Sequence, residues 1–154
     1  MPQHCQHPTQ LFPRMRHIWL KAFLLARVMA KRRPRTGDRI LILKEKWLKM
    51  ILLKKKTLEV RSRPLKSGHW WLGCKGFISG EALIGSAFQI HDMATWDEHQ
   101  ARHCVEAKCL PYKKTCGHPI LHVRKVIPTS FVHPKGAVGI VIYKEAPSQP
   151  EQDK

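Results

Sequence analysis

Lys56-Thr57-Leu58-Glu59-Val60-Arg61 is the most informative stretch of this sequence, and Ser62-Arg63-Pro64 follows it directly. Apolar and polar residues alternate within it, which is the pattern of a short β-strand that a proline then ends. Alternation places Glu59 and Arg61 on the same face of that strand. A carboxylate and a guanidinium so placed can pair with each other, or can form the polar wall of a binding pocket. The alternative interpretation is an exposed strand face with an incidental ion pair.

The chain is strongly basic. Its 154 residues include 28 Lys and Arg against 11 Asp and Glu, a formal net charge of +17. All of the acidic residues follow residue 37, yet the region 38–154 still has 20 basic residues against those 11. Such a surface attracts polyanions through a salt-dependent field. Nucleic acid is the polyanion that we expect, and an anionic membrane surface is the alternative.

Residues 1–37 form a separate basic N-terminal extension, rich in Gln, His, Pro and Arg. Within it, Ile18–Ala30 is a predicted helix of 13 residues, which is too short to span a bilayer. The extension fits an organelle transit peptide, a disordered basic arm, or translation from a start upstream of the true one at Met29. The cluster Lys31-Arg32-Arg33-Pro34-Arg35 fits a nuclear signal, a nucleic-acid contact or a solvated linker.

The five cysteines are an odd number for a disulfide framework, and we find no secretory signal. We therefore expect reduced thiols and an intracellular protein, with cytoplasmic, organellar and nuclear locations all compatible.

From Gly37 onward, strand and helix patterns are mixed. Apolar residues in Lys44–Lys54 recur at the spacing of one buried helical stripe. Thr95-Trp96-Asp97-Glu98 has the spacing of a capping box, which predicts a second helix from there to about Lys108. Gly80 and Gly85 are expected at bulges or close approaches of the backbone. His69–Cys74 and Gly76–Ile90 together predict two or more strands. Further strands are predicted at Arg39–Leu43, Thr57–Arg61, Ile120–Ile127 and Ala137–Tyr143. The expected fold class is α+β, a small β-barrel with two short flanking helices.

Residues 38–146 resemble the ASCH domain (activating signal cointegrator homology), a PUA-like β-barrel, and residues 147–154 form a polar tail. The resemblance rests on the order of these pieces: Ile40-Leu41-Ile42-Leu43, a helix ending at Lys54, the Lys56–Arg61 run, Gly80-Glu81-Ala82-Leu83-Ile84-Gly85, Tyr112-Lys113-Lys114 and Gly136-Ala137-Val138-Gly139. In one departure, the family commonly has a glycine two residues before the lysine, where this chain has Lys54. In another, Thr115-Cys116-Gly117-His118 stands where the family often has an aromatic residue.

The resemblance implies a cleft that binds RNA or a modified nucleoside, because PUA-like barrels are mostly RNA readers. Some ASCH members are similar to hydrolases that remove the acetyl group of N4-acetylcytidine with a lysine, a threonine and a glutamate. That lysine falls on Lys56, and the threonine position is occupied by Glu59. Glu98 and Glu106 are candidates for the glutamate. The catalytic set is therefore altered here, with Lys56 and Glu59 as candidate catalytic residues and no cofactor.

The residues alone support the same two functions. Lys56, surrounded by other cations, can have a lowered pKa and act as base or nucleophile, with Glu59 as base or as the group that orients it. Alternatively, Lys56 and Arg61 bind phosphate while Glu59 pairs with Arg61. Trp70 and Trp71 face opposite sides of a strand, so Trp71 can stack a base while Trp70 is core, unless both are buried. The expected RNA-binding residues are Lys54, Lys55, Lys56, Arg61, Arg63 and Trp71. A third possibility is an interaction domain that meets an acidic protein.

Histidines and cysteines are dense between residues 99 and 118. His99 and His103 are four residues apart, so they share a face of the predicted helix. Zinc needs four converging ligands, usually with close cysteine pairs, and the sequence has no Cys-x-x-Cys. We therefore expect no metal site among His99, His103, Cys104, Cys109, Cys116 and His118.

Overall fold

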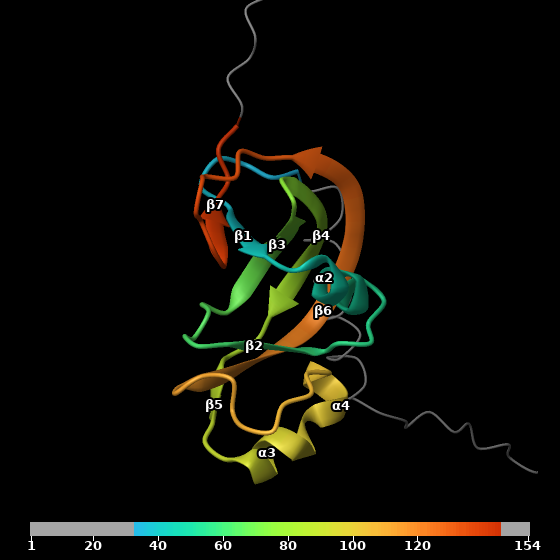
Figure 1. The fold of residues 1–154 in the computed structure, drawn as a ribbon. Coiled ribbons are helices and arrows are strands. Elements are labelled where there is room, and N and C mark those ends of the chain that lie inside the picture. Colours follow the sequence, from blue (N-terminus) through green and yellow to red (C-terminus); the bar gives the residue numbers. More distant parts are fainter. Residues whose placement is uncertain (1–32, 146–154) are drawn as a thin grey trace, which may run out of the picture. The chain divides into compact units, whose positions relative to one another are not determined.

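The computed structural model describes residues 33–145 (Figure 1). The chain divides into two units, Met1–Arg33 and Pro34–Lys154, and the second unit contains all but one of the described residues. The predicted helix at Ile18–Ala30 and the polar tail at 147–154 lie outside the described residues. None of the helices in the described part is long and apolar enough to cross a membrane.

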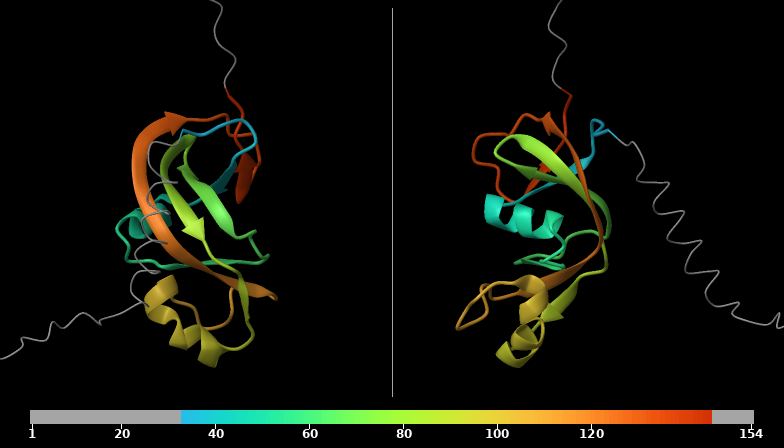
Figure 2. Two further views of the ribbon diagram at one scale, coloured as in Figure 1. Left: turned by 180° about the vertical axis from the view of Figure 1, so that it is seen from behind. Right: turned by 90° about the vertical axis from the view of Figure 1, so that its right-hand side faces the viewer.

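One mixed sheet forms the second unit, and its strands curl toward closure as a half-barrel (Figure 2). The strand order is β2-β6-β4-β3-β1-β7, with β5 paired to β6, and only the β1–β3 pairing is parallel among the described strands. The strands are β1 (Arg39–Ile42), β2 (Leu58–Arg61), β3 (Gly68–Cys74), β4 (Phe77–Ile84), β5 (Phe88–Ile90), β6 (Thr115–Ser130) and β7 (Ile140–Ile142). The predicted α+β barrel class is confirmed, and each predicted strand region contains a strand, although β6 is longer and β7 shorter than expected.

Three helices are present in the described part: α2 (Glu45–Leu52), α3 (Met93–Glu98) and α4 (Gln100–His103). The apolar stripe of α2 packs against the sheet, as its spacing predicts. Helices α3 and α4 lie beyond the sheet, at the end where β2 and β5 flank β6 (Figure 1).

The prediction of the second helix was wrong at both of its ends. Its N-cap is Asp92, whose Oδ1 accepts a hydrogen bond from the Thr95 amide at 2.7 Å, so the helix begins before Thr95. Aspartate is among the strongest N-caps because it satisfies an amide of the first turn that has no helical partner. The helix also does not continue to Lys108. It breaks at His99, and α4 ends where Cys104 adopts a left-handed backbone with φ 58°.

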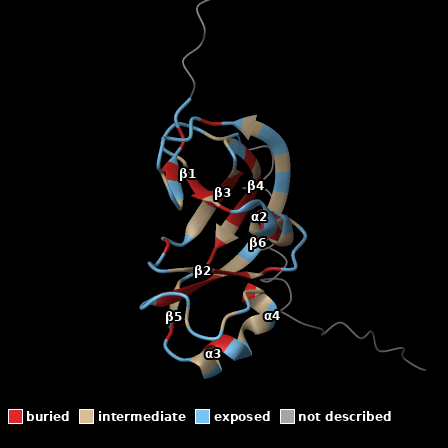
Figure 3. Cartoon of the chain, viewed as in Figure 1, coloured by how far each residue is buried: buried red, intermediate tan, exposed pale blue. Residues whose placement is uncertain are grey.

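Buried residues lie along the strands of the sheet (Figure 3). Their side chains form two clusters on opposite faces of the sheet. Trp70 belongs to the cluster beneath α2, and its neighbour Trp71 belongs to the other, because successive strand residues point to opposite faces. Each tryptophan is only 1% exposed. The Trp71 indole donates to Asp38 Oδ2 at 2.9 Å. The structure thus corrects the assignment of Trp71 as a base-stacking residue, since a second core cluster covers its ring.

Gly80 allows α2 to approach the sheet closely. The β4–β6 register shifts between Ile78 and Gly80, which confirms the predicted irregularity. A Cβ atom at this position would lie 2.6 Å from Leu52 Cδ2 and 3.1 Å from the Arg124 carbonyl oxygen. A side chain here would therefore push the helix away from the sheet.

The turn after α2 is a Schellman motif with a lysine in the position that usually requires glycine. Lys54 has φ 59°, its amide donates to the Ile51 carbonyl, and the Lys55 amide donates to the Met50 carbonyl, both at 2.9 Å. These two bonds satisfy carbonyls that the end of a helix leaves unpaired. The departure from the family pattern thus changes the residue but keeps the turn, at the cost of strain in Lys54.

Lys54→Gly is expected to stabilise the domain. Glycine adopts the left-handed region without the steric penalty of a Cβ atom, a difference of about 1 kcal/mol. The melting temperature should rise by roughly 3–6 °C, measured by circular dichroism. Lys55→Gly is the matched control, because the left-handed conformation is confined to its neighbour, and it should lower the melting temperature. If both variants melt lower, Lys54 does not adopt this turn.

Candidate functional site

Lys56 is fully embedded in the protein, with 2% of the residue exposed. Its Nζ donates to the carbonyl oxygens of Leu58, at 2.9 Å, and His103, at 2.6 Å. The ammonium also lies 3.6 Å from Glu59 Oε2 and 5.1 Å from the centre of the Trp47 ring. An ammonium group has three hydrogens, and three oxygen acceptors surround this one. Lys56 therefore ties the start of β2 to the end of α4.

Glu59 and Arg61 extend this cluster toward β1. Glu59 is 5% exposed, and its Oε1 accepts from Arg61 Nε at 2.8 Å. Arg61 Nη2 donates to the Ile42 carbonyl at 2.9 Å. The predicted pairing of Glu59 with Arg61 is confirmed, and it is a largely buried pair, not an incidental contact on a solvated strand face. We call Lys56, Glu59 and Arg61 the β2 cluster.

Two buried histidines support the β2 cluster from either side. His118 Nε2 accepts from the Leu65 amide at 2.8 Å, and its Nδ1 lies 3.2 Å from the Glu59 carbonyl oxygen. His103 Nδ1 accepts from the Val105 amide at 3.0 Å, and its Nε2 lies 2.9 Å from the Trp96 carbonyl oxygen. In each ring one nitrogen must be bare to accept and the other must carry hydrogen to donate. We infer from these partners that both rings are neutral.

Burial governs the protonation of these groups. It lowers the pKa of Lys56, and the nearby Glu59 carboxylate opposes that effect. Burial also lowers the pKa of both His103 and His118, while their hydrogen bonds to backbone carbonyls act in the opposite direction. Desolvation penalises the charged form of a base, which is why all three shifts have the same sign.

Comparison with solved structures identifies the architecture. A crystal structure of the ASCH protein from Zymomonas mobilis superposes with a TM-score of 0.51 at 16% identity, covering 71% of this chain and 89% of that one. A serine-to-alanine mutant of the same protein gives a TM-score of 0.57 at 15% identity, covering 73% and 92%. The domain has the ASCH fold. A scan against protein-family models finds no match, and a comparison with curated protein sequences finds none either.

Within this ASCH fold, three exposed basic residues flank the β2 cluster along the chain. Lys54 and Lys55 are exposed in the turn before Lys56, and Arg63 is exposed just after the strand. The Arg61 side chain is intermediate, with 21% of its surface exposed. Five basic residues of this stretch were predicted to bind RNA, and four of them are at least partly exposed to solvent.

Glu98 and Glu106, the candidates for a catalytic glutamate, are both exposed. Among the described residues, no hydrogen bond or ion pair joins either of them to Lys56. The acid beside Lys56 in this domain is Glu59.

In the described part of the chain, no three His, Cys, Asp or Glu side chains are grouped to hold a metal ion. The geometry of His103 gives a physical reason at this position. The lone pair of its unprotonated ring nitrogen already accepts a hydrogen bond from the Val105 amide, so the neutral ring has no second lone pair to bind a metal.

The sequence interpretation missed a second buried polar cluster, centred on Glu81. This residue is 0% exposed, accepts from Arg124 Nε at 2.6 Å and lies 2.7 Å from His69 Nε2. Glu81 pairs with Arg124 across the β4–β6 ladder. An isolated acid inside an otherwise apolar strand was the available signal, because such a residue needs a buried partner.

Lys56→Met is expected to destabilise the domain severely. Methionine keeps much of the side-chain volume but leaves the Leu58 and His103 carbonyls and the Glu59 carboxylate without their cation. Breaking a buried ion pair from one side costs about 3–5 kcal/mol. Urea denaturation should show this loss, whereas the exposed control Lys55→Met should change stability by less than about 0.5 kcal/mol. Equal stabilities for the two variants would contradict the buried position of Lys56.

The buried histidines predict acid sensitivity. Because the folded pKa lies below the ordinary value of 6.5, the unfolded chain binds more protons as the pH falls through that value. The free energy of unfolding should therefore decrease as pH drops below about 6.5. His118→Gln should flatten this dependence, while His122→Gln, an exposed change in the same strand, should keep it. An unchanged slope in the His118 variant would refute its neutral, buried state.

Proposed function

We propose that this ASCH-fold domain binds single-stranded RNA through the exposed cations beside the β2 cluster. Lys54, Lys55 and Arg63 contact phosphates, and Arg61 lies at the partly exposed centre of the same stretch. The observation that carries the proposal is the turn at Lys54. It presents two adjacent lysines to solvent while the next residue, Lys56, is anchored in the protein.

The distribution of charge supports a polyanionic ligand. In residues 33–145, the exposed acidic residues are Glu45, Asp92, Asp97, Glu98, Glu106 and Glu145. Exposed basic residues outnumber them by more than two to one: Arg33, Arg35, Lys44, Lys46, Lys49, Lys54, Lys55, Arg63, Lys66, Lys75, Lys108, Lys113, Lys114, Lys125, Lys135 and Lys144. Glu59 and Glu81 are buried against cations, so they contribute little negative potential at the surface. The outer surface is therefore suited to phosphate contacts.

Lys56 acts in this proposal as a positioning residue. Its ammonium would have to leave two carbonyls and a carboxylate to reach a phosphate. Holding β2 against α4 instead keeps the turn at Lys54 and the strand at Arg61 in fixed positions. A binding surface whose cations are held in place loses less conformational entropy when it engages a ligand.

RNA binding by this surface should depend on salt and on three named residues. We expect a short oligouridylate, followed by fluorescence anisotropy between about 50 and 200 mM salt, to bind more weakly as salt rises. Replacing Lys54, Lys55 and Arg63 with Gln should lower the slope of log K against log salt by roughly 2, about 0.7 for each lost phosphate contact.

The matched control replaces Lys108, Lys135 and Lys144 with Gln, which removes the same charge from other exposed positions. This control should keep nearly the full slope. Equal losses in the two triple variants would show only a general field effect, and they would overturn the assignment of the surface.

A second candidate function is hydrolysis of an N4-acylated cytidine. It is favoured by the position of Lys56 beside a carboxylate and by burial, which lowers the pKa of Lys56 and so disfavours its charged form. In this reaction water adds to the acyl carbon, the C–N bond breaks, and the leaving nitrogen takes a proton to give cytidine and acetate. Glu59 would orient Lys56 or share its proton.

Incubation with N4-acetylcytidine tests this second function. It predicts release of cytidine, followed by chromatography, that Glu59→Gln reduces strongly while retaining a side chain of the same shape. Glu59→Gln is the more informative variant because it keeps an oxygen acceptor for Lys56 and Arg61, whereas replacing Lys56 is expected to unfold much of the protein. Circular dichroism at the assay temperature checks that the Glu59→Gln variant is folded. Absence of turnover above that of Glu59→Gln would remove the hydrolase and leave the RNA-binding proposal untouched.

A further inference from the structure

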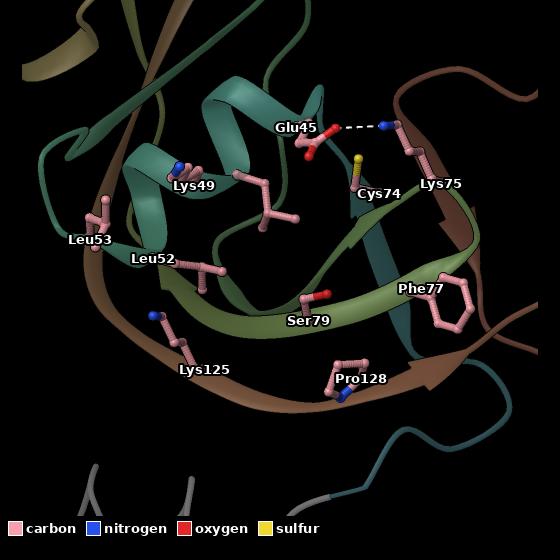
Figure 4. Close-up of a pocket in the computed structure, with 11 residues that line it drawn as sticks. Glu45, Lys49, Leu52, Leu53, Cys74, Lys75, Phe77, Ser79, Lys125 and Pro128 are labelled. Atoms are coloured by element: carbon pink, nitrogen blue, oxygen red, sulfur yellow. Dashed lines mark hydrogen bonds and ion pairs between the residues drawn. The ribbon is translucent and has the colours of Figure 1, made fainter.

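A groove lies between α2 and strands β4 and β6, and it shares no residue with the β2 cluster. Its volume is about 520 Å³, within the range of ligand and side-chain binding sites. Figure 4 shows α2 along one side and the two strands along the other. We propose that this groove binds an amphipathic helix of a partner protein, with apolar residues on one face and acidic residues beside them.

Most of the surface of the groove is apolar, although charged residues and Ser79 also contribute to its lining. Leu52 and Pro128 contribute to its surface, and Leu53 and Phe77 stand toward opposite ends (Figure 4). Leu53 is 49% exposed and Phe77 is 51% exposed, so both extend the apolar surface beyond the cavity itself. Single exposed apolar residues are common, but a concave apolar lining flanked by two of them marks an interaction surface.

Charge on the rim indicates the sign of the partner. The lining contains one acid, Glu45, and Lys75 already pairs with it at 2.5 Å. Lys49 and Lys125 also line the groove, and among the described residues neither forms an ion pair. Both lie toward the Leu53 end (Figure 4). Carboxylates on the partner would match these two ammonium groups, whereas a basic or neutral segment would leave them unmatched.

The dimensions suit a helix. The wall formed by α2 and its C-cap residue runs from Glu45 to Leu53, about 12 Å at 1.5 Å per residue. Positions i and i+7 of a second helix are about 10.5 Å apart, so anchors at i, i+4 and i+7 span this wall. An acyl chain would fill the cavity but leave the exposed parts of Leu53 and Phe77 uncovered. A nucleobase would place its polar edge against a lining whose one hydroxyl is that of Ser79.

Cys74 provides a built-in reporter, because this free thiol lines the groove and is partly exposed. The probe is a synthetic helical peptide with Leu at i, i+4 and i+7 and Glu at the flanking positions. Alkylation of the full chain by iodoacetamide is followed by peptide mass spectrometry. At four times the Kd of the peptide, alkylation of Cys74 should slow about fivefold. Alkylation of the exposed Cys109, which lies outside the groove, should keep its rate.

Variants and control peptides make the test specific. Phe77→Ser and Lys125→Glu should each abolish most of the protection, whereas Val132→Ser and Lys135→Glu, at exposed positions outside the lining, should preserve it. Peptides with Lys in place of Glu, or Ser in place of Leu, should not protect Cys74.

Equal protection by the Lys peptide, or no protection by the Glu peptide, would overturn the proposal. Protection by decanoate or by the oligouridylate where the Glu peptide fails would also overturn it, in favour of a small amphiphile or nucleic acid. The RNA-binding variant changes Lys54, Lys55 and Arg63, none of which lines the groove, so either proposal can fail alone.

Discussion

The buried ammonium of Lys56 is the interaction on which the rest of this structure depends. It binds the carbonyls of Leu58 and His103 and faces the Glu59 carboxylate, so it joins the second strand to the end of α4, at a residue 47 positions after Lys56. Glu59 in turn accepts a hydrogen bond from Arg61, and Arg61 donates another to the Ile42 carbonyl. Removing one partner of a buried charge is strongly destabilising, so the stability of this region depends on all of these contacts together.

Because Lys56 is buried, the lysine that holds this region in position is not one of the cations on the surface. Lys56, the candidate catalytic residue of the sequence analysis, is the least accessible of the basic stretch, and the exposed charge lies on its neighbours. Lys54 adopts a left-handed backbone conformation in the turn before Lys56. Glu81 is a second buried acid, which accepts a hydrogen bond from Arg124 and lies close to His69. It lies on the face of β3 and β4 that is opposite α2. Together the two clusters withdraw acids from the surface and leave it basic.

The groove beside α2 and the basic stretch around β2 have different chemistry. One is an apolar concavity with two unpaired lysines on its rim, and the other is a series of exposed cations on a rigid backbone. Because α2 leads directly into the turn at Lys54, one helix contributes a wall to the groove and its end to the basic stretch. The two proposals therefore assign a polyanion and a protein segment to separate residues of the domain.

The sequence by itself determined the features that arise from neighbours along the chain. Alternation predicted β2 and the Glu59–Arg61 pair, an apolar stripe predicted α2, and the order of these pieces predicted the ASCH fold. It misplaced the helix after β5, because the capping aspartate competes with an equally plausible Thr-x-x-Glu pattern. Only the tertiary structure decided the burial of Lys56, the neutral state of His118 and the enclosure of Trp71. These three features depend on which groups from distant parts of the chain surround each side chain. Those groups set the desolvation of the side chain, and the local spacing of residues does not encode them.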